Sequence, residues 1–214
     1  KHIIGDGENA KHEIERNHEL IKDFTDSKAE KPRLYPSAAD EAAVKVYKTF
    51  SYITVSPASV WFTKQYPRQK WIDFIGKVPP AYTVYLIGSS ADKELAEDIK
   101  NKSTHEWVIN LCGKLSILKS AALMKDAAMN YVNDSAPMHF ASAVNAPVTA
   151  VYCSTIPSFG FGPLSDKSFI VETKEKLSCR PCGLHGKRIC PLGHFNCAYS
   201  IRDGQLLHSL PLAL

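Results

Sequence analysis

The sequence predicts an α/β domain, a Rossmann-type parallel sheet with crossover helices. Two observations favour this class, and the length limits the number of domains. Apolar segments of strand length alternate with helical segments of about ten residues or more, as in parallel sheets. Polar loops follow three of the predicted strands, and such sheets bind ligands beyond the carboxyl ends of their strands. The length of 214 residues allows one large domain or two small ones, with a substantial core.

The N-terminal residues are expected to connect this domain to a preceding one. A helix is predicted over residues 8–24, and a linker with two prolines over 28–36. Residues 1–4 read as the end of a strand or connection, and the chain does not begin with methionine. We therefore expect 1–36 to be an interdomain connection, the remainder of an absent N-terminal domain, and 37–214 to be the ligand-binding domain.

The predicted elements of the main domain alternate in order. They are a helix over 37–48, a strand over 52–56, a helix over 67–75, a strand over 82–87, a helix over 91–102, a strand over 108–111, a helix over 116–125, a strand over 129–132, a helix beginning near Pro137 and a strand over 148–153. Ser37 is a suitable cap for the first helix. This repeated order of strand and helix is the basis for predicting a parallel sheet.

Composition and charge narrow the function classes. The hydrophobic fraction is 44% and the charged fraction 22%, which is ordinary for a globular protein. A net charge of +4 suits anionic ligands or a membrane surface. Lysine and arginine are scattered and do not interleave with aromatic residues, which disfavours nucleic-acid binding. No apolar run reaches the roughly 18 residues that span a bilayer, and the first residues lack the apolar core of a signal peptide.

The segment NDSAPMH, residues 133–139, is the most informative part of the chain. It turns sharply after an apolar run and opens a helix, whose N-terminus would present unpaired N–H groups and partial positive charge to a phosphate. Asp134 or Ser135 is a suitable cap, and Pro137 suits the first turn. His139, beside Asp134, is a candidate for ligand contact. The alternative is an ordinary capped helix.

Two further loops at predicted strand ends carry groups suited to a nucleotide. In the first, Lys64 offers a charge, and Ser59 and Thr63 offer hydroxyls, for phosphate binding. The alternative is a solvated surface lysine. The second loop begins with Gly88 and carries Asp92, which either binds ribose hydroxyls or favours a helix start. Neither a G-x-G-x-x-G nor a P-loop motif is present.

A cysteine cluster lies late in the chain. Its members are Cys179, Cys182, Cys190 and Cys197, with His185 and His194 nearby. This spacing makes the four cysteines candidate ligands of a structural zinc ion, although the second pair is not a C-x-x-C. The alternative is a set of reduced, packed thiols that stiffen a loop rich in proline and glycine. Cys112 and Cys153, at predicted strand ends, are expected to be buried apolar residues.

Four segments together resemble the lipopolysaccharide heptosyltransferases of glycosyltransferase family 9. They are HEIERN, SPASVWFTKQYPRQKW, NDSAPMHFASAVNAPVTAVY and CRPCGLHGKRICPLGHFNC, in this order. The resemblance implies two Rossmann-like domains in a GT-B arrangement. It also implies that this chain is the second, nucleotide-sugar-binding half.

The resemblance implies an inverting transfer of heptose from ADP-heptose to the lipopolysaccharide inner core. No cofactor would be required. A lipid-linked acceptor would bind through the missing domain, so peripheral contact with the cytoplasmic face of the inner membrane is expected. The catalytic base would also lie in that domain, and this chain alone should not turn over. Two alternatives remain: a GT-B transferase using another nucleotide sugar, and a zinc-stabilised binding module around residues 179–197.

The resemblance also implies roles for individual residues. Ser59 and Lys64 would face the donor phosphates, Asp92 would hold the ribose, Leu115 would lie near the adenine, Asp134 would hold heptose hydroxyls, Ser135 and Ala136 would donate backbone N–H groups to the diphosphate, and His139 would stand beside them. Lys64 would stabilise the charge on the leaving group, an interaction whose removal typically costs about 3 kcal/mol. Two residues depart from the family pattern: Ala136 replaces a glycine, and Val60 replaces a hydroxyl residue.

Overall fold

A six-stranded parallel sheet forms the centre of the molecule, and the predicted fold class is confirmed. The computed structural model describes residues 10–211. The strands are β1 (Tyr52–Ser56), β2 (Thr83–Leu86), β3 (Val108–Asn110), β4 (Met129–Asn133), β5 (Val148–Tyr152) and β6 (Ser168–Glu172). Their order across the sheet is β3-β2-β1-β4-β5-β6, and every neighbouring pair is parallel. This is the order of a doubly wound dinucleotide-binding sheet.

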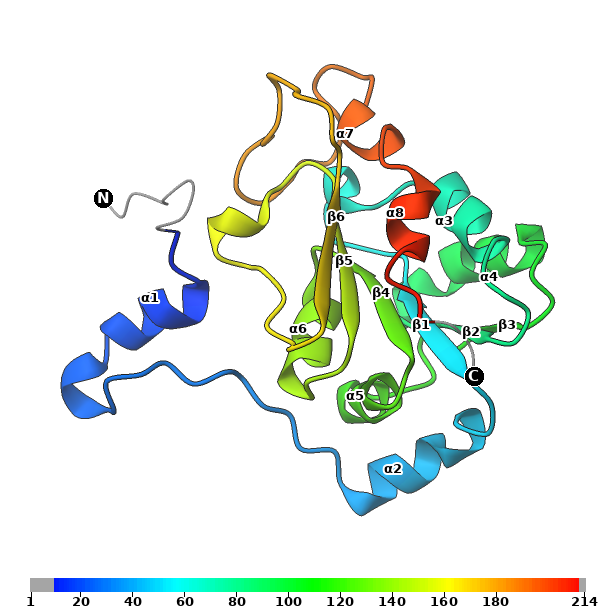
Figure 1. Cartoon of the computed structure of the whole chain (residues 1–214), viewed down its shortest axis with the longest axis horizontal. Coiled ribbons are helices and arrows are strands. Elements are labelled where there is room, and N and C mark those ends of the chain that lie inside the picture. The colour runs from blue at the N-terminus through cyan, green and yellow to red at the C-terminus, as the bar shows by residue number, and fades with distance from the viewer. Residues whose placement is uncertain (1–9, 212–214) are drawn as a thin grey trace.

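Helices cover both faces of the sheet (Figure 1). The α-helices are α1 (Glu13–Glu19), α2 (Ala38–Val44), α3 (Arg68–Ile75), α4 (Lys93–Lys102), α5 (Ile117–Lys125), α6 (Ala136–Ala143), α7 (Asn196–Tyr199) and α8 (Asp203–Leu207), of which α1 lies apart from the sheet. One core cluster joins the sheet to α3, α4, α7 and α8, and a second joins it to α2, α5 and α6. Since both faces are covered, every residue of β1, β4 and β5 is buried, as the apolar runs of the sequence require.

The N-terminal segment follows a different path. The helix predicted over 8–24 is shorter: α1 begins after His12, whose ring accepts from the backbone of the first turn, and the chain then forms a separate 3-10 helix, Lys22–Phe24. Residues 1–9, including the predicted strand end, lie outside the described residues. A long extended segment then runs from this region to α2 (Figure 1).

The helix α1 is tied to the loop after β5. The backbone N–H of Glu13 donates to the carbonyl of Gly160 at 2.8 Å, and the guanidinium of Arg16 donates to the carbonyl of Phe159 at 2.6 Å. The His12 ring lies 3.1 Å from the carbonyl of Gly162. The start of the connection therefore rests on a loop that also belongs to the sheet domain.

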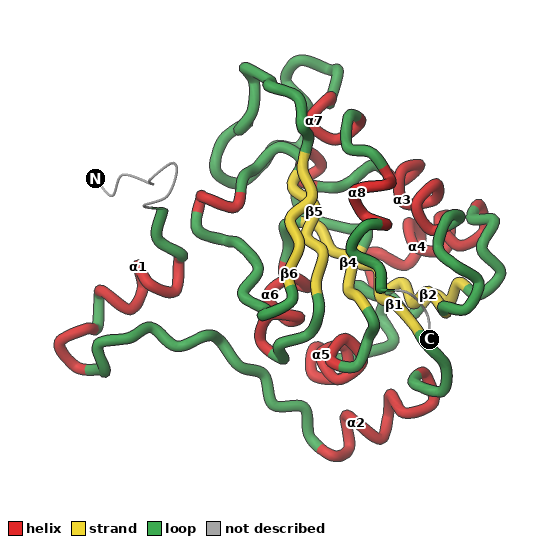
Figure 2. The backbone as a smooth tube through the Cα atoms, in the orientation of Figure 1, coloured by secondary structure: helices red, strands yellow, loops and turns green. Residues whose placement is uncertain are grey.

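Three elements near the C-terminus were not predicted. The strand β6 forms one edge of the sheet; its apolar run, residues 169–171, is only three residues long, and only Val171 of its five residues is buried. The helices α7 and α8 have four and five residues, too short to show helical periodicity. Most of the chain between β6 and α7 is loop (Figure 2). Across residues 10–211 no helix is long and apolar enough to cross a membrane.

Candidate functional site

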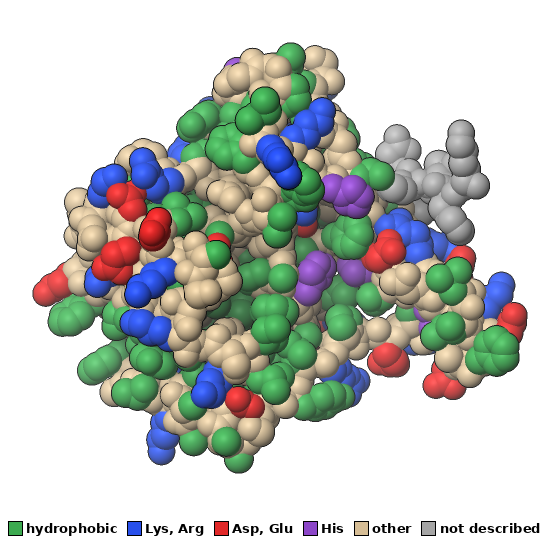
Figure 3. Space-filling view, turned by 180° about the vertical axis from the view of Figure 1, so that it is seen from behind, with side chains coloured by type: hydrophobic (Ala, Val, Ile, Leu, Met, Phe, Trp, Pro, Cys, Tyr) green, Lys and Arg blue, Asp and Glu red, His purple; other side chains and the backbone are tan. Residues whose placement is uncertain are grey.

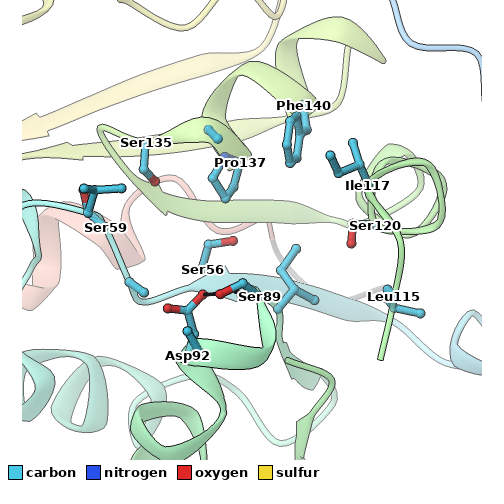
Figure 4. A pocket seen from close by; sticks show the side chains of 16 residues that line it. Ser56, Ser59, Ser89, Asp92, Leu115, Ile117, Ser120, Ser135, Pro137 and Phe140 are labelled. Carbon is cyan, nitrogen blue, oxygen red and sulfur yellow. Dashed lines mark hydrogen bonds between the residues drawn. The ribbon is translucent and has the colours of Figure 1, made fainter. Parts of the chain in front are cut away.

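A cavity of about 550 Å³ opens at the carboxyl edge of the sheet (Figure 4). The loops after β1, β2 and β4 supply its walls together with α5 and α6. Its lining residues are Ser56, Ala58, Ser59, Val60, Ile87, Gly88, Ser89, Ala91, Asp92, Leu115, Ile117, Ser120, Ser135, Ala136, Pro137 and Phe140. The chain runs from β1 to β2 and β3 on one side of β1, and it then forms β4 on the other side of β1. The cavity therefore lies at the topological switch point, where doubly wound sheets bind ligands.

The two ends of the cavity differ in polarity. Leu115, Ile117 and Phe140 gather at one end, around the start of α5 and the first turns of α6, whereas Ser59 and Ser135 lie toward the other (Figure 4). An apolar wall suits a planar base, and hydroxyl and backbone N–H groups suit phosphate oxygens. The structure thus brings five of the predicted residues to one cavity. They are Ser59, Asp92, Leu115, Ser135 and Ala136.

The N-terminus of α6 faces this cavity without a side-chain cap. Ser135 occupies the N-cap position, but its hydroxyl donates to the carbonyl of Asn133 at 3.3 Å and accepts no helix N–H. Asp134 makes other contacts, so the predicted capping role of either side chain is wrong. Within residues 10–211, no hydrogen bond engages the backbone N–H of Ser135 or Ala136. Two donors and the positive end of the helix are therefore available to an anion.

Asp92 lies on the cavity wall and also starts a helix. Its Oδ2 accepts from the backbone N–H of Ser89 at 2.8 Å and from the Ser89 hydroxyl at 2.7 Å. The loop brings Gly88 close to this carboxylate, since a Cβ on that glycine would lie 2.8 Å from Oδ2. The helix-starting role is therefore confirmed. Ribose binding by Asp92 stays a prediction, made from a position on the cavity wall.

The second part of the predicted site is an ion pair that does not line the cavity. Lys64 Nζ lies 2.8 Å from Asp134 Oδ2, and the two side chains are only 17% and 8% exposed. The hydroxyl of Thr155 donates to the same carboxylate oxygen at 2.7 Å. Lys64 is therefore not the solvated surface lysine of the alternative interpretation. The loops that carry Lys64 and Asp134, both expected at the carboxyl edge of the sheet, are joined by this contact.

His139 lies on α6 in the neighbourhood of this pair. Burial lowers the pKa of its imidazole, and the nearby charges of His12 and Lys64 lower it further, whereas Asp134 opposes the shift. Histidine side chains gather where the α1 segment meets the body of the molecule (Figure 3). The neutral imidazole is therefore favoured in the folded protein, where it can donate or accept a hydrogen bond.

Thr63 differs from the other predicted residues. Its side chain is 1% exposed, and its hydroxyl accepts from the backbone N–H of Lys187 at 2.7 Å and from the Ser154 hydroxyl at 3.0 Å. These bonds hold the loop that carries Lys64. Val60, in contrast, is 91% exposed on the cavity wall, where its side chain offers no hydrogen bond.

Two residues that support the site were not predicted. Asn133 is fully buried; its amide oxygen accepts from the backbone N–H of Tyr66 at 2.8 Å, and its NH₂ donates to the carbonyl of Pro57 at 2.9 Å. It therefore joins the end of β4 to the loop after β1. Thr155, the partner of Asp134, follows β5 in the run Cys153–Thr155. Asn133 ends β4, so a polar residue at the end of a buried strand could have drawn attention to it, whereas Thr155 lies three residues beyond β5 and carries no such local signal.

The cysteines do not form a metal centre in the described part of the chain. Within residues 10–211 no three histidine, cysteine, aspartate or glutamate side chains are grouped so that they could hold a metal ion. Cys179 Sγ lies 3.9 Å from His194 Nε2. The predicted zinc ligands are therefore not brought together as a site. Cys112 and Cys153 are buried as expected, and burial raises the pKa of the Cys112 thiol to about 12.

Comparisons with known proteins show the family and the fold of this chain. The sequence matches the family described as glycosyltransferase family 9 (heptosyltransferase) over residues 5–190. A lipooligosaccharide heptosyltransferase 2 of Haemophilus influenzae is 35% identical over 101 residues, which cover 46% of this chain and 29% of that protein.

Two solved structures share the fold. The ADP-heptose lipopolysaccharide heptosyltransferase II of Escherichia coli superimposes with a TM-score of 0.70 at 22% identity, over 88% of this chain and 55% of that one. A family 9 glycosyltransferase of Veillonella parvula superimposes with a TM-score of 0.76 at 18% identity, over 95% and 60%. This chain therefore covers little more than half of each of these structures. By its match over most of its length, the chain belongs to glycosyltransferase family 9, the heptosyltransferases.

Proposed function

We propose that this chain is the donor-binding half of an inverting glycosyltransferase that moves heptose from ADP-heptose to the lipopolysaccharide inner core. The observation that carries the proposal is the uncapped N-terminus of α6 on the cavity wall, where the N–H groups of Ser135 and Ala136 make no hydrogen bond to any of residues 10–211. The E. coli and H. influenzae relatives, described as heptosyltransferases of lipopolysaccharide and lipooligosaccharide, support the substrate class.

Successive parts of the cavity would suit the adenine, the ribose and the diphosphate of ADP, in that order. The adenine would lie at the apolar end, against Leu115 and Phe140. The ribose would lie near Asp92, and the diphosphate would receive N–H donors from the start of α6. A volume of about 550 Å³ is within the ordinary range of small-molecule sites.

The ion pair would serve the sugar and the leaving group. As the glycosidic bond breaks, negative charge develops on the diphosphate, and the Lys64 ammonium and the α6 N-terminus would stabilise it. Asp134, one residue before the helix cap, would accept hydrogen bonds from heptose hydroxyls. No residue of this chain is assigned as the base that deprotonates the acceptor. We expect donor binding without turnover from this chain alone, with the lipid-linked acceptor reached at the cytoplasmic face of the inner membrane through residues outside it.

Calorimetric titration with ADP, UDP and ADP-heptose tests the nucleotide and the sugar separately. We expect ADP to bind at least about tenfold more tightly than UDP, because the apolar end fits a purine, and ADP-heptose to bind more tightly still.

Ser120→Phe, which places a ring in the cavity, should weaken ADP binding by at least about tenfold while leaving the melting temperature nearly unchanged. Equal affinities for ADP and UDP, or full binding by the Ser120 variant, would overturn the assignment of the cavity. If another ADP-sugar bound more tightly than ADP-heptose, that sugar nucleotide would become the proposed donor.

A further inference from the structure

The Cys-rich segment reaches into the candidate site and does not stand apart from it. The backbone N–H of Thr63 donates to the carbonyl of Lys187 at 3.1 Å, and the N–H of Lys187 donates back to the Thr63 hydroxyl at 2.7 Å. The N–H of Cys182 donates to the carbonyl of Ser154 at 2.8 Å. We call residues 180–187, which make these contacts, the near arm. It joins the loop that carries Lys64 to the loop after β5.

The near arm approaches Lys64 most closely at Gly186. This glycine has φ +78°, in the left-handed region, and a Cβ there would lie 2.8 Å from Cγ of Lys64 and 3.0 Å from Cβ of Trp61. Both distances are shorter than side chains normally allow. Only glycine therefore permits this backbone to lie against the aliphatic stem of Lys64.

The other end of the near arm is fixed by Arg180. Its guanidinium donates to the carbonyls of Cys153 and Thr155, both at 2.8 Å, and pairs with Glu172 at 2.6 Å. This side chain is only 12% exposed. Since the Thr155 hydroxyl bonds to the Asp134 carboxylate, the near arm contacts the supports of both members of the Lys64–Asp134 pair.

We infer that the near arm is a positioning element of the donor site, and that Gly186 and the Thr63–Lys187 hydrogen bonds set where the Lys64 ammonium lies. The inference rests on the proposed function, because it assigns Lys64 to the donor. Gly186 and Thr63 act here as positioning residues that touch Lys64 or its loop. The Cys-rich segment is accordingly a part of the donor-binding half.

Gly193 provides a matched control in the same segment. It also has a positive φ, +73°, but a Cβ there would meet nothing within 4 Å. Gly186→Ala and Gly193→Ala therefore impose similar backbone strain, and only the first adds a collision with Lys64. Calorimetry should show Gly186→Ala binding ADP-heptose at least about tenfold more weakly than Gly193→Ala, which should stay within about twofold of the unmodified chain. Equal binding by the two variants would overturn the inference.

If ADP-heptose does not bind to the unmodified chain, the proposed function is overturned, but the positioning of Lys64 by Gly186 can still be tested. Melting curves provide that test. The extra loss of melting temperature in Gly186→Ala, relative to Gly193→Ala, should shrink when Lys64→Ala removes the stem that the new Cβ meets. An unchanged difference would show that Gly186 does not act on Lys64.

Thr63 supplies a second test if Gly186→Ala fails to fold. Thr63→Ser keeps the hydroxyl that accepts from Lys187, whereas Thr63→Val keeps only the shape. We expect the serine variant to retain binding of ADP-heptose and the valine variant to lose about tenfold. Equal losses in both variants would overturn the positioning role.

Discussion

The two parts of the candidate donor site, the cavity wall and the Lys64–Asp134 pair, differ in whether their polar groups already have partners. The cavity wall presents the N–H groups at the start of α6, which have no partner in the described part of the chain, beside exposed apolar side chains. In the Lys64–Asp134 pair the charges already have partners, because the lysine neutralises the aspartate and the Thr155 hydroxyl donates to the same carboxylate oxygen. Under the proposed function, a nucleotide would bind in the cavity without displacing an internal hydrogen bond of these N–H groups. A sugar diphosphate that uses Lys64 must compete with Asp134 for the ammonium group.

The comparison suggests why the charged pair is built in. Each charge holds the other in place, so that under the proposed function neither side chain would have to be ordered when a donor binds. Such pre-organisation lowers the entropic cost of binding. The cost is a buried carboxylate that depends on its cation. Three predictions test this difference, from the largest expected effect to the smallest.

Breaking the ion pair should have the largest effect on stability. Lys64→Met leaves the Asp134 carboxylate, 8% exposed, without its cation and should lower the free energy of unfolding by about 3 kcal/mol in urea denaturation. The double variant Lys64→Met/Asp134→Leu should recover much of this loss, because no charge remains buried. A double variant as unstable as the single one would show that the pair does not couple.

An exposed pair supplies the control for this experiment. Lys31 contacts Asp166 at the same distance of 2.8 Å, but the two side chains are 52% and 74% exposed. Lys31→Met should leave the unfolding curve nearly unchanged, since water solvates the carboxylate that remains. A similar loss in both lysine variants would trace the effect to the lost side-chain packing, and the burial of the charge would then be irrelevant.

Two similar capping arrangements allow the effect of Asp92 on stability to be distinguished from its effect on ligand binding. Asp92 accepts from the backbone and hydroxyl of Ser89, and Asp40 does the same for Ser37 at the start of α2. Asp92→Ala should lower the melting temperature by about 2–4 °C. Asp40→Ala should also lower it, since its hydrogen bonds to Ser37 hold the pKa of that carboxyl below its usual value. Only Asp92→Ala should weaken ADP binding in calorimetry. An equal effect of both variants on binding would remove Asp92 from the site.

The smallest expected effect is a pH dependence that arises from His139. Burial holds the pKa of its imidazole below the ordinary 6.5, so in that range the unfolded chain binds more protons than the folded one. Stability should therefore fall as the pH drops below about 6.5. Lys64 and His12 add to this effect and Asp134 opposes it. Melting curves of His139→Gln should show a flatter pH dependence than those of the exposed control His208→Gln. Parallel curves would contradict the assignment.

The parts that sequence alone could predict are those with a local signal. Buried parallel strands appear as apolar runs, and the loops that follow them carry the polar residues. This is why Lys64 and Asp134, 70 positions apart in the sequence, could be expected at the same edge. The edge strand β6 was not predicted, because its apolar run of three residues, 169–171, is too short to distinguish a strand from a loop.

The supporting contacts lay beyond sequence reasoning for a different reason. Gly186 is required because the stem of Lys64 lies against it, and Thr155 matters because Asp134 lies within hydrogen-bond reach. Neither residue differs locally from an ordinary loop glycine or threonine. Their roles are defined by partners that only the folded chain brings near. The same holds for Thr63, whose hydroxyl appeared available for phosphate and instead binds the near arm.

The strand order has a consequence for how the chain folds. The strands β1 and β4 pair at the switch point, where Thr54 lies opposite Asn130, 76 positions away in the sequence. The other neighbouring strands of the sheet are much closer to each other along the chain. Closing the longest loop costs the most chain entropy and comes with the slowest kinetics. We therefore expect two locally formed halves, β1 to β3 and β4 to β6, to join late in folding, and the ligand cavity to appear only when that seam closes.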